Sequence, residues 1–414
     1  MYDTILLPNG VRVVTEAMDG VRSAAVGIWV GVGSRMEKST ESGSAHFIEH
    51  MLFKGTTRRN AAQLAEDMDA IGGQCNAFTT RNSTCFYTRS LDTHLAFSSE
   101  ILSEMFFDSL FDQKDVESER SVILDEMDMY RDSPEDLVTE QLMTRCFPGP
   151  LGRPILGRRS TLNRFTGESL RSFMQREYRP DRVVVALSGS CTDRDVQLLC
   201  DRFSALEPRK KSRVAPGVYT PVTVLKRKRT EQNQLVLAWE GLPIGSEDRF
   251  ACQVFSTIFG EGLSSRLFQT VREKYGLCYS ICSYTGSYEE TGLFGIATAV
   301  GRETEMQALS LIRTEVDKML QDGVTPQELS RARELIKANM VMGLESTTSR
   351  MNRIGSGVLQ LGSVLSVDEV IERYDAVTAD DVLRLARSIM RPEQLSFSAV
   401  GKVGEEEEYH SVLK

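Results

Sequence analysis

A chain of 414 residues exceeds what one compact core usually holds and predicts two or three domains. Hydrophobic residues make up 41% and charged residues 26%, which is typical of a globular protein, and no run of 18 apolar residues occurs, so no membrane span or membrane partner is expected. The net charge of −9 argues against a nucleic-acid partner and is compatible with basic peptides.

The cysteines and the amino terminus bear on the compartment. Eight cysteines are scattered without a Cys-x-x-Cys pair, which favours reduced thiols over disulfides or a cysteine zinc site. The chain begins Met1-Tyr2-Asp3, with no basic start, apolar signal region or Arg-rich leader. We therefore expect a cytoplasmic protein, the alternative being one whose leader has been removed.

The first elements expected are strands. Pro8-Asn9-Gly10 is typical of a hairpin turn, here between strands at residues 4–7 and 11–16. An apolar run at residues 24–31 is followed by a polar turn that leads into a helix, and residues 75–89 predict a second hairpin. Short connections with few βαβ periods favour an antiparallel or mixed sheet with helices on one side.

The most informative feature is the pattern His46-x-x-Glu49-His50, in a chain that has only four histidines. On a helix, positions i and i+4 share one face roughly 6 Å apart, so two imidazoles there can bind one ion about 2 Å from each nitrogen. Glu49 lies close enough to hold a water on that ion. The spacing is the inverted form of the His-Glu-x-x-His zinc hydrolase motif. It predicts a catalytic zinc site; the alternative is a histidine pair that caps or packs on a surface helix.

An acidic helix predicted at residues 115–127 offers a third ligand. Val116 and Ile123 are expected to pack inward, and five carboxylates lie along the segment. A catalytic zinc needs a third protein ligand, and a carboxylate is expected because no cysteine pair or further histidine lies nearby. Glu119 and Glu126 are seven residues apart and share a helix face, so the residues alone do not choose between them.

The second half repeats the pattern of the first. Residues 179–189 and 391–401 each follow a helical stretch and enclose an apolar run between a proline and a glycine nine residues later. Residues 24–31 likewise resemble residues 233–240. The repeat predicts two related domains of about 200 residues each.

The predicted domains are residues 1–212, which carry the catalytic zinc site, and residues 213–414, which lack it. The boundary lies in a basic, proline-bearing stretch between Pro208 and Gly217. On the register of the repeat, the three motif positions of the first half become Cys252, Phe255 and Ser256. The second half is therefore expected to have the same fold but no zinc site.

The motif, the Phe-Lys-Gly-Thr segment at residues 53–56 and the acidic helix together resemble the M16 metallopeptidases: insulinase, pitrilysin and the mitochondrial processing peptidases. The resemblance covers essentially the whole chain. It implies that Glu126, 76 positions beyond His50, is the third zinc ligand, and that Glu119 orients a ligand. It implies an α+β fold of two homologous α/β domains, each a mostly antiparallel sheet with helices packed on it.

The resemblance also implies residues that bind the substrate. Asn76, Ala77 and Phe78 match an edge strand on which the peptide backbone lies as an added strand; an ordinary strand is the alternative. Arg272 and Tyr279 match a pair that binds the substrate, supports the transition state and, in two-chain assemblies, reaches the zinc site of the facing chain. For Tyr279 the alternative is a half-buried aromatic residue on a strand.

The function implied is that of a zinc-dependent endopeptidase, with one zinc per chain, that cleaves unfolded peptides or presequence-like segments inside a closed dimer chamber. Glu49 would take the proton from the zinc-bound water, and the partner would be a second copy or a related subunit. The rival is a non-catalytic peptide-binding or assembly subunit of the same fold. Such subunits lose the zinc motif, which is intact here, and the processing-peptidase partner carries a long glycine-rich loop that is short here, at residues 260–265. These features favour the catalytic type.

Overall fold

The computed structural model describes residues 2–209 and 214–413, which form two compact units. The first unit comprises Met1–Met127, Arg153–Ala215 and Met342–Ser366; the second comprises Asp128–Gly152, Pro216–Val341 and Val367–Lys414. Each unit thus contains one segment from the other half of the sequence. The predicted domain boundary between residues 212 and 213 lies outside the described residues.

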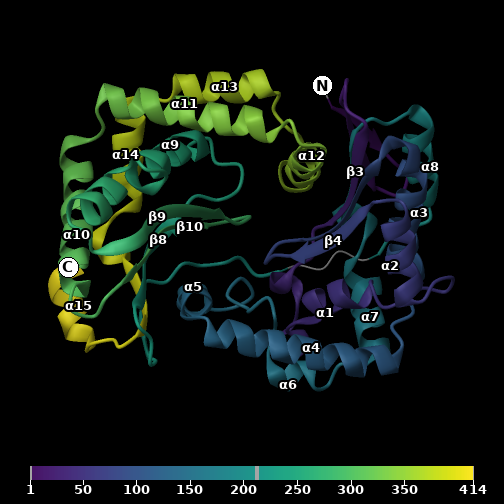
Figure 1. Ribbon diagram of the computed structural model, residues 1–414, viewed down its shortest axis with the longest axis horizontal. Helices are drawn as coiled ribbons and strands as arrows, with labels where there is room; N and C mark the ends of the chain where they lie inside the picture. Colours follow the sequence, from purple (N-terminus) through teal and green to yellow (C-terminus); the bar gives the residue numbers. More distant parts are fainter. Residues whose placement is uncertain (1, 210–213, 414) are drawn as a thin grey trace. The chain divides into compact units, whose positions relative to one another are not determined.

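The first unit is built on a six-stranded mixed sheet in the order β1-β2-β6-β3-β5-β4. Figure 1 labels β3 and β4 of this sheet. Its strands are β1 (Asp3–Leu6), β2 (Arg12–Ala17), β3 (Ser23–Val30), β4 (Gln74–Thr79), β5 (Thr84–Leu91) and β6 (Val183–Gly189). Only the β2–β6 pair is parallel. Both predicted hairpins, β1–β2 and β4–β5, are confirmed.

The helices of the first unit include the two that carry the zinc-site candidates, α1 and α4, although residues 128–132 at the end of α4 belong to the second unit. They are α1 (Ser44–Met51), α2 (Ala61–Ala70), α3 (Leu95–Asp108), α4 (Gln113–Asp132), α6 (Arg159–Leu162), α7 (Gly167–Glu177), α8 (Asp193–Phe203) and α12 (Thr347–Leu361), with 3-10 turns η1 (Ser34–Met36), η2 (Ser39–Glu41), η3 (Asp92–His94) and η4 (Pro180–Arg182). The predicted acidic helix is confirmed as α4, with Val116 and Ile123 fully buried.

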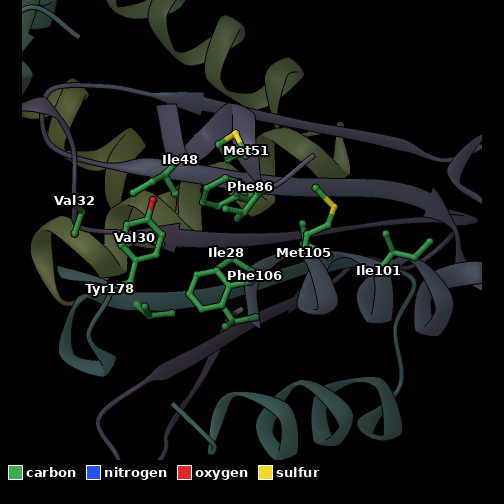
Figure 2. Packing of buried hydrophobic residues seen from close by; sticks show 14 of the residues in the cluster. Ile28, Val30, Val32, Ile48, Met51, Phe86, Ile101, Met105, Phe106 and Tyr178 are labelled. Atoms are coloured by element: carbon green, nitrogen blue, oxygen red, sulfur yellow. The ribbon is translucent and has the colours of Figure 1, made fainter. Parts of the chain in front are cut away.

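The main core of this unit joins α1 and α3 to the sheet. Figure 2 shows Ile48 and Met51 of α1, Met105 of α3 and Phe86 of β5 in one cluster with Ile28 of β3. All five side chains are at most 2% exposed. Because α1 is anchored through this apolar face, its histidine-bearing face is held at a fixed angle to the sheet.

The expectation that helices cover only one side of the sheet is wrong. α12, from the second half of the sequence, packs on β2, β3 and β6 and lies beside β3 in Figure 1. The contact is close because two glycines allow it: a Cβ on Gly27 would lie 2.3 Å from Met351, and one on Gly355 would lie 2.3 Å from Trp29. A strand covered on both faces is buried along nearly its whole length, as β3 is.

The second unit repeats this topology in a five-stranded sheet, in the order β7-β11-β8-β10-β9. Its strands are β7 (Thr223–Arg227), β8 (Asn233–Gly241), β9 (Cys278–Ser287), β10 (Gly292–Val300) and β11 (Ser396–Gly401). Again one pair, β7–β11, is parallel and the others are antiparallel. The predicted fold class, two related domains with mostly antiparallel sheets, is confirmed.

Helices of the second unit include α5, which comes from the first half of the sequence and packs on β8 and β11. The elements are α5 (Pro134–Cys146), α9 (Arg249–Gly260), the π-helical turn η5 (Phe268–Lys274), α10 (Glu305–Asp322), α11 (Pro326–Gly343), α13 (Val367–Ala376), α14 (Ala379–Ile389), η6 (Pro392–Gln394) and α15 (Glu406–Leu413). No helix within residues 2–209 and 214–413 is long and apolar enough to cross a membrane.

Candidate metal centre

The amino end of α1 is fixed by a buried carboxylate. Glu37 accepts hydrogen bonds from the backbone N–H groups of Gly43 (2.8 Å) and Ala45 (2.9 Å), one on each oxygen. Gly43 has φ 98°, a left-handed conformation that favours glycine. Burial raises the pKa of Glu37 well above its ordinary value, although the two backbone bonds oppose this. Sequence analysis missed Glu37, whose only signal is an acidic residue shortly before a helix start.

Three potential metal ligands converge in the first unit. Their donor atoms, from His46 and His50 on α1 and Glu126 on α4, all lie within 4.8 Å of one another. Glu126 Oε2 is 3.6 Å from His46 Nε2 and 3.7 Å from His50 Nε2. Among the residues that the structure describes, this is the one group of three or more His, Cys, Asp or Glu side chains arranged to hold a metal ion.

The chemistry of this group fits a zinc ion. Glu126 Oε2 is buried and has no hydrogen-bond partner, which is costly for a carboxylate unless a cation compensates it. Burial, and then the neighbouring His50, lowers the pKa of His46 to about 3, so its imidazole is neutral and keeps a lone pair at pH 7. Two imidazoles and one carboxylate are a donor set found in catalytic zinc sites, with a position left for water.

Glu119 lies against one of these ligands. Its Oε1 is 2.8 Å from His50 Nδ1 and its Oε2 is 2.5 Å from Lys54 Nζ. Burial acts to raise the pKa of Glu119, but hydrogen bonds from His50 and Lys54 outweigh it and the pKa is lowered. The ionised carboxylate favours the tautomer with the proton on Nδ1, which leaves His50 Nε2 free to bind a metal. Sequence analysis did not identify Lys54 as Glu119's partner.

Glu49 projects from the same helix toward the sheet. Its Oε2 accepts a hydrogen bond from Thr79 Oγ1 at the end of β4 (2.5 Å). Burial raises the pKa of Glu49, partly opposed by the Thr79 hydrogen bond and by His50. A carboxylate whose pKa is shifted toward neutrality is suited to accept and return a proton. Thr79 therefore ties the candidate base to the strand that carries the candidate substrate-binding residues.

That strand, β4, is an edge of the sheet. Thr80 N donates to Ser83 O across the β4–β5 turn (2.8 Å), and the alternation of an antiparallel ladder then directs the N–H and C=O groups of every second residue away from β5. These residues are Cys75, Ala77 and Thr79, of which Ala77 already donates its N–H to the neighbouring Asn76 Oδ1 (2.8 Å). The predicted residues Asn76, Ala77 and Phe78 thus lie on a strand with backbone groups open to another strand.

The remaining predicted residues lie together in the second unit. Arg272 is on η5 and Tyr279 on β9, and the Arg272 guanidinium carbon is 5.0 Å from the Tyr279 ring centroid. The same guanidinium also lies over Phe268, at 4.5 Å. Tyr279 is 79% exposed, so it is not the half-buried residue of the alternative interpretation. The structure brings this pair together, in the unit that does not carry the histidine cluster.

Comparison with known proteins identifies relatives along nearly the whole chain. Residues 12–159 match the family model described as insulinase (peptidase family M16), and residues 164–336 match the model described as the peptidase M16 inactive domain. The uncharacterized zinc protease YmxG of Bacillus subtilis is 39% identical over 386 residues, which cover 92% of this chain and 94% of that protein. A relative in Streptomyces coelicolor, also named a zinc protease, is 39% identical over 409 residues, covering 95% and 88%.

Two solved structures share the fold at 19% identity. One is a protease from Helicobacter pylori, with a TM-score of 0.89 over 97% of this chain and 99% of that one. The other is a peptidase M16 inactive domain from Pseudomonas fluorescens, with a TM-score of 0.90 over 97% and 98%. At this identity the likeness establishes the two-domain architecture.

Proposed function

The chain belongs to the M16 peptidase family, and from this premise we propose that it is a zinc-dependent endopeptidase that cleaves unfolded peptides or presequence-like segments. The observation that carries the proposal is the convergence of His46, His50 and Glu126 beside Glu49, which is hydrogen-bonded to an open edge strand. A metal site, a proton acceptor and a binding edge for an extended backbone are what peptide hydrolysis requires.

His46, His50 and Glu126 would hold one zinc ion, which when bound acts as a Lewis acid that polarises the scissile carbonyl and makes water more acidic. Glu49 accepts the proton of the attacking water and delivers it to the nitrogen of the leaving amine. Glu119, held by Lys54, keeps the His50 ring in one orientation and one tautomer.

The open backbone groups of β4 would bind an extended peptide as an added strand. Such binding uses main-chain hydrogen bonds and is largely independent of the peptide sequence. A folded protein rarely offers a free extended segment, so the substrate class is unfolded peptide. Thr79, hydrogen-bonded to Glu49, would bring the bound backbone next to the proton acceptor.

The test of this function is Glu49→Gln. Glutamine has nearly the same shape but cannot accept the proton, so cleavage of an unstructured peptide should fall about 10²-fold to 10⁴-fold. Zinc content, measured by metal analysis of the same preparation, should stay at the wild-type level. Unchanged cleavage by the variant would remove Glu49 as the base. A wild-type protein that binds zinc and peptide but cleaves none would instead indicate a peptide-binding or assembly subunit.

We also propose that two copies form a closed chamber in which Arg272 and Tyr279 of one chain serve the zinc site of the other. The exposure of Tyr279 and its contact with Arg272, in a unit without the histidine cluster, support this. Mixing an Arg272→Ala/Tyr279→Phe chain with a Glu49→Gln chain should restore partial activity, because one site of a mixed dimer would be complete. Confirmed subunit exchange without any recovery of activity would rule out the trans arrangement.

We also propose that the protein is cytoplasmic, on the basis of its free cysteines. All eight are free, as expected for a reducing compartment.

A further inference from the structure

A cavity of about 590 Å³ lies in the first unit between α2, α3 and the beginning of β4. Its floor is apolar, since four lining side chains are at most 5% exposed: Leu64 and Met68 of α2, and Ile101 and Met105 of α3. None of the three candidate zinc ligands lines it, nor does Glu49. The volume falls within the usual range of ligand sites, roughly 300–1,000 Å³.

The wall formed by α2 consists of small residues. Ala61 and Ala65 are exposed, are spaced i and i+4 and therefore share the helix face that borders the cavity, and Asp69 continues this row at the rim. Where most helices would place longer side chains, two methyl groups leave the space open. Ala62, which is also exposed on α2, does not line the cavity.

The opposite wall is the start of β4. Gly73 and Cys75 line the cavity, and Cys75 Sγ is 3.9 Å from Met105 Sδ. Burial raises the pKa of the Cys75 thiol to about 12, so this group is neutral and behaves as an apolar surface. Phe53, which follows the zinc-motif helix in sequence, also lines the cavity, as do Gln74, Asn76 and Tyr87.

The register of β4 relates this cavity to the candidate base. Side chains alternate along a strand, so Cys75 and Ala77 face the same side of the sheet as Thr79, the residue hydrogen-bonded to Glu49. The same residues direct their backbone groups to the open edge. In a peptide added to this edge, the residue opposite Cys75 points its side chain to the same face, four positions along from the residue opposite Thr79.

We propose that this cavity is a subsite that selects a large apolar side chain, such as Leu, Met or Phe, of the extended substrate, at one position remote from the cleaved bond. The inference rests on the proposed function in that β4 is taken as the substrate strand. Four buried apolar side chains form the floor and only Asp69 offers a charge at the rim. The subsite would give the enzyme a preference for certain peptide sequences, which the main-chain hydrogen bonds to β4 do not provide.

The test is a series of unstructured peptides in which a single Leu is moved along an otherwise uniform sequence. The peptides are no longer than the β4 edge, so that a shift of register would lose main-chain hydrogen bonds. Binding is measured by fluorescence anisotropy on the full-length Glu49→Gln protein, which does not consume the peptide. We expect one Leu position to bind on the order of 10-fold more tightly than the others, as is typical for filling an apolar pocket. The same position should set the distance between Leu and the bond cut by the wild-type enzyme.

The matched variants are Ala65→Trp, which fills the cavity, and Ala62→Trp, which places the same side chain on the same exposed helix outside it. Ala65→Trp should abolish the positional preference and Ala62→Trp should retain it; Ala65→Leu, a smaller change, should reduce it. Thermal melting of each variant checks folding. Retention of the preference by both Ala65 variants, a preference for Lys or Arg, or equal binding at every Leu position would overturn the proposal.

The two proposals fail separately. If the wild-type protein cuts peptides without regard to the position of Leu, and binding is equally indifferent, the subsite is wrong and the peptidase stands. If no peptide is cut but the Leu preference appears in binding and is lost in Ala65→Trp, the subsite stands and the proposed catalysis is wrong.

Discussion

α1 and α9 follow corresponding strands, β3 and β8, in two sheets whose strand order is the same apart from the additional edge strand β1. The two helices differ in the side chains that they carry. α1 carries His46 and His50, which form the metal-binding group with Glu126, and also Glu49. In α9 the equivalent positions on the repeat are filled by groups that serve packing. Phe255 is fully buried and stacks on Phe294 with ring centroids 4.7 Å apart, and Ser256 Oγ donates to Glu261 Oε1 (2.6 Å).

The next pair of helices differs in the same way. α4 follows α3 and buries an acid, Glu119, close to Glu126; α11 follows α10, and its buried residues are Leu329 and Ala332. One scaffold can therefore hold a polar site or an apolar interior at the same place. The fold is maintained by the sheet and its apolar helix faces, whereas the chemistry depends on a few side chains, and this is why the fold alone does not establish activity.

The helix starts are also held differently. α1 is capped by both oxygens of buried Glu37, whereas Asp248 at the start of α9 makes no side-chain cap and instead pairs with Arg384 (2.7 Å) at the surface. The start of α1, which carries the candidate metal ligands, is thus fixed by hydrogen bonds to a buried carboxylate. A helix that only packs is fixed by its apolar face.

Substitutions of the acidic residues of α4 are expected to have the largest effect, which is on zinc affinity. Glu126→Gln should weaken zinc binding by more than the roughly 10-fold to 100-fold expected for Glu119→Gln, because Glu126 is proposed as a ligand and Glu119 acts through His50. Asp125→Asn, which changes the neighbouring acid, is the control and should leave affinity unchanged. Competition with a zinc chelator measures all three. A reversed ranking would show that the family register is misplaced on α4.

The helix caps give a smaller effect. Glu37→Ala leaves two buried backbone N–H groups without partners and should destabilise the protein by about 1–3 kcal/mol. Asp248→Ala removes an exposed ion pair and should cost about 0–1 kcal/mol. Urea unfolding monitors both, and zinc affinity should fall in the Glu37 variant alone. Equal destabilisation by the two substitutions would mean that α1 is not held by its cap in the way described.

Those parts of the molecule that depend on local pattern could be predicted from the sequence. The two hairpins follow from turn residues and alternation, and α4 follows from the spacing of Val116 and Ile123. The grouping of His46 and His50 follows from helix geometry. The choice of Glu126 over Glu119 came from family resemblance, because both acids share one face of one helix.

Contacts between distant residues could not be predicted. The packing of α12 on the first sheet brings Met351 Sδ within 3.4 Å of Trp29 Nε1, although the two residues are 322 positions apart in the chain. Because the hydrophobic effect is non-directional, a sequence pattern does not indicate which distant apolar segments will pack together. Glu37, Lys54 and Thr79 were missed for the same reason, since each acts through a tertiary contact. The uninterrupted apolar run at residues 24–30 was a usable signal that both faces of β3 are covered.

The most direct test of the central claim, that one of two equivalent units carries the metal site, is zinc stoichiometry in matched variants. Wild-type protein should bind one zinc per chain. His46→Ala/His50→Ala should bind none while the second unit stays folded, and Cys252→Ala, at the equivalent place in α9, should still bind one. Full zinc occupancy in the histidine double variant, or loss of zinc in the Cys252 variant, would contradict the account.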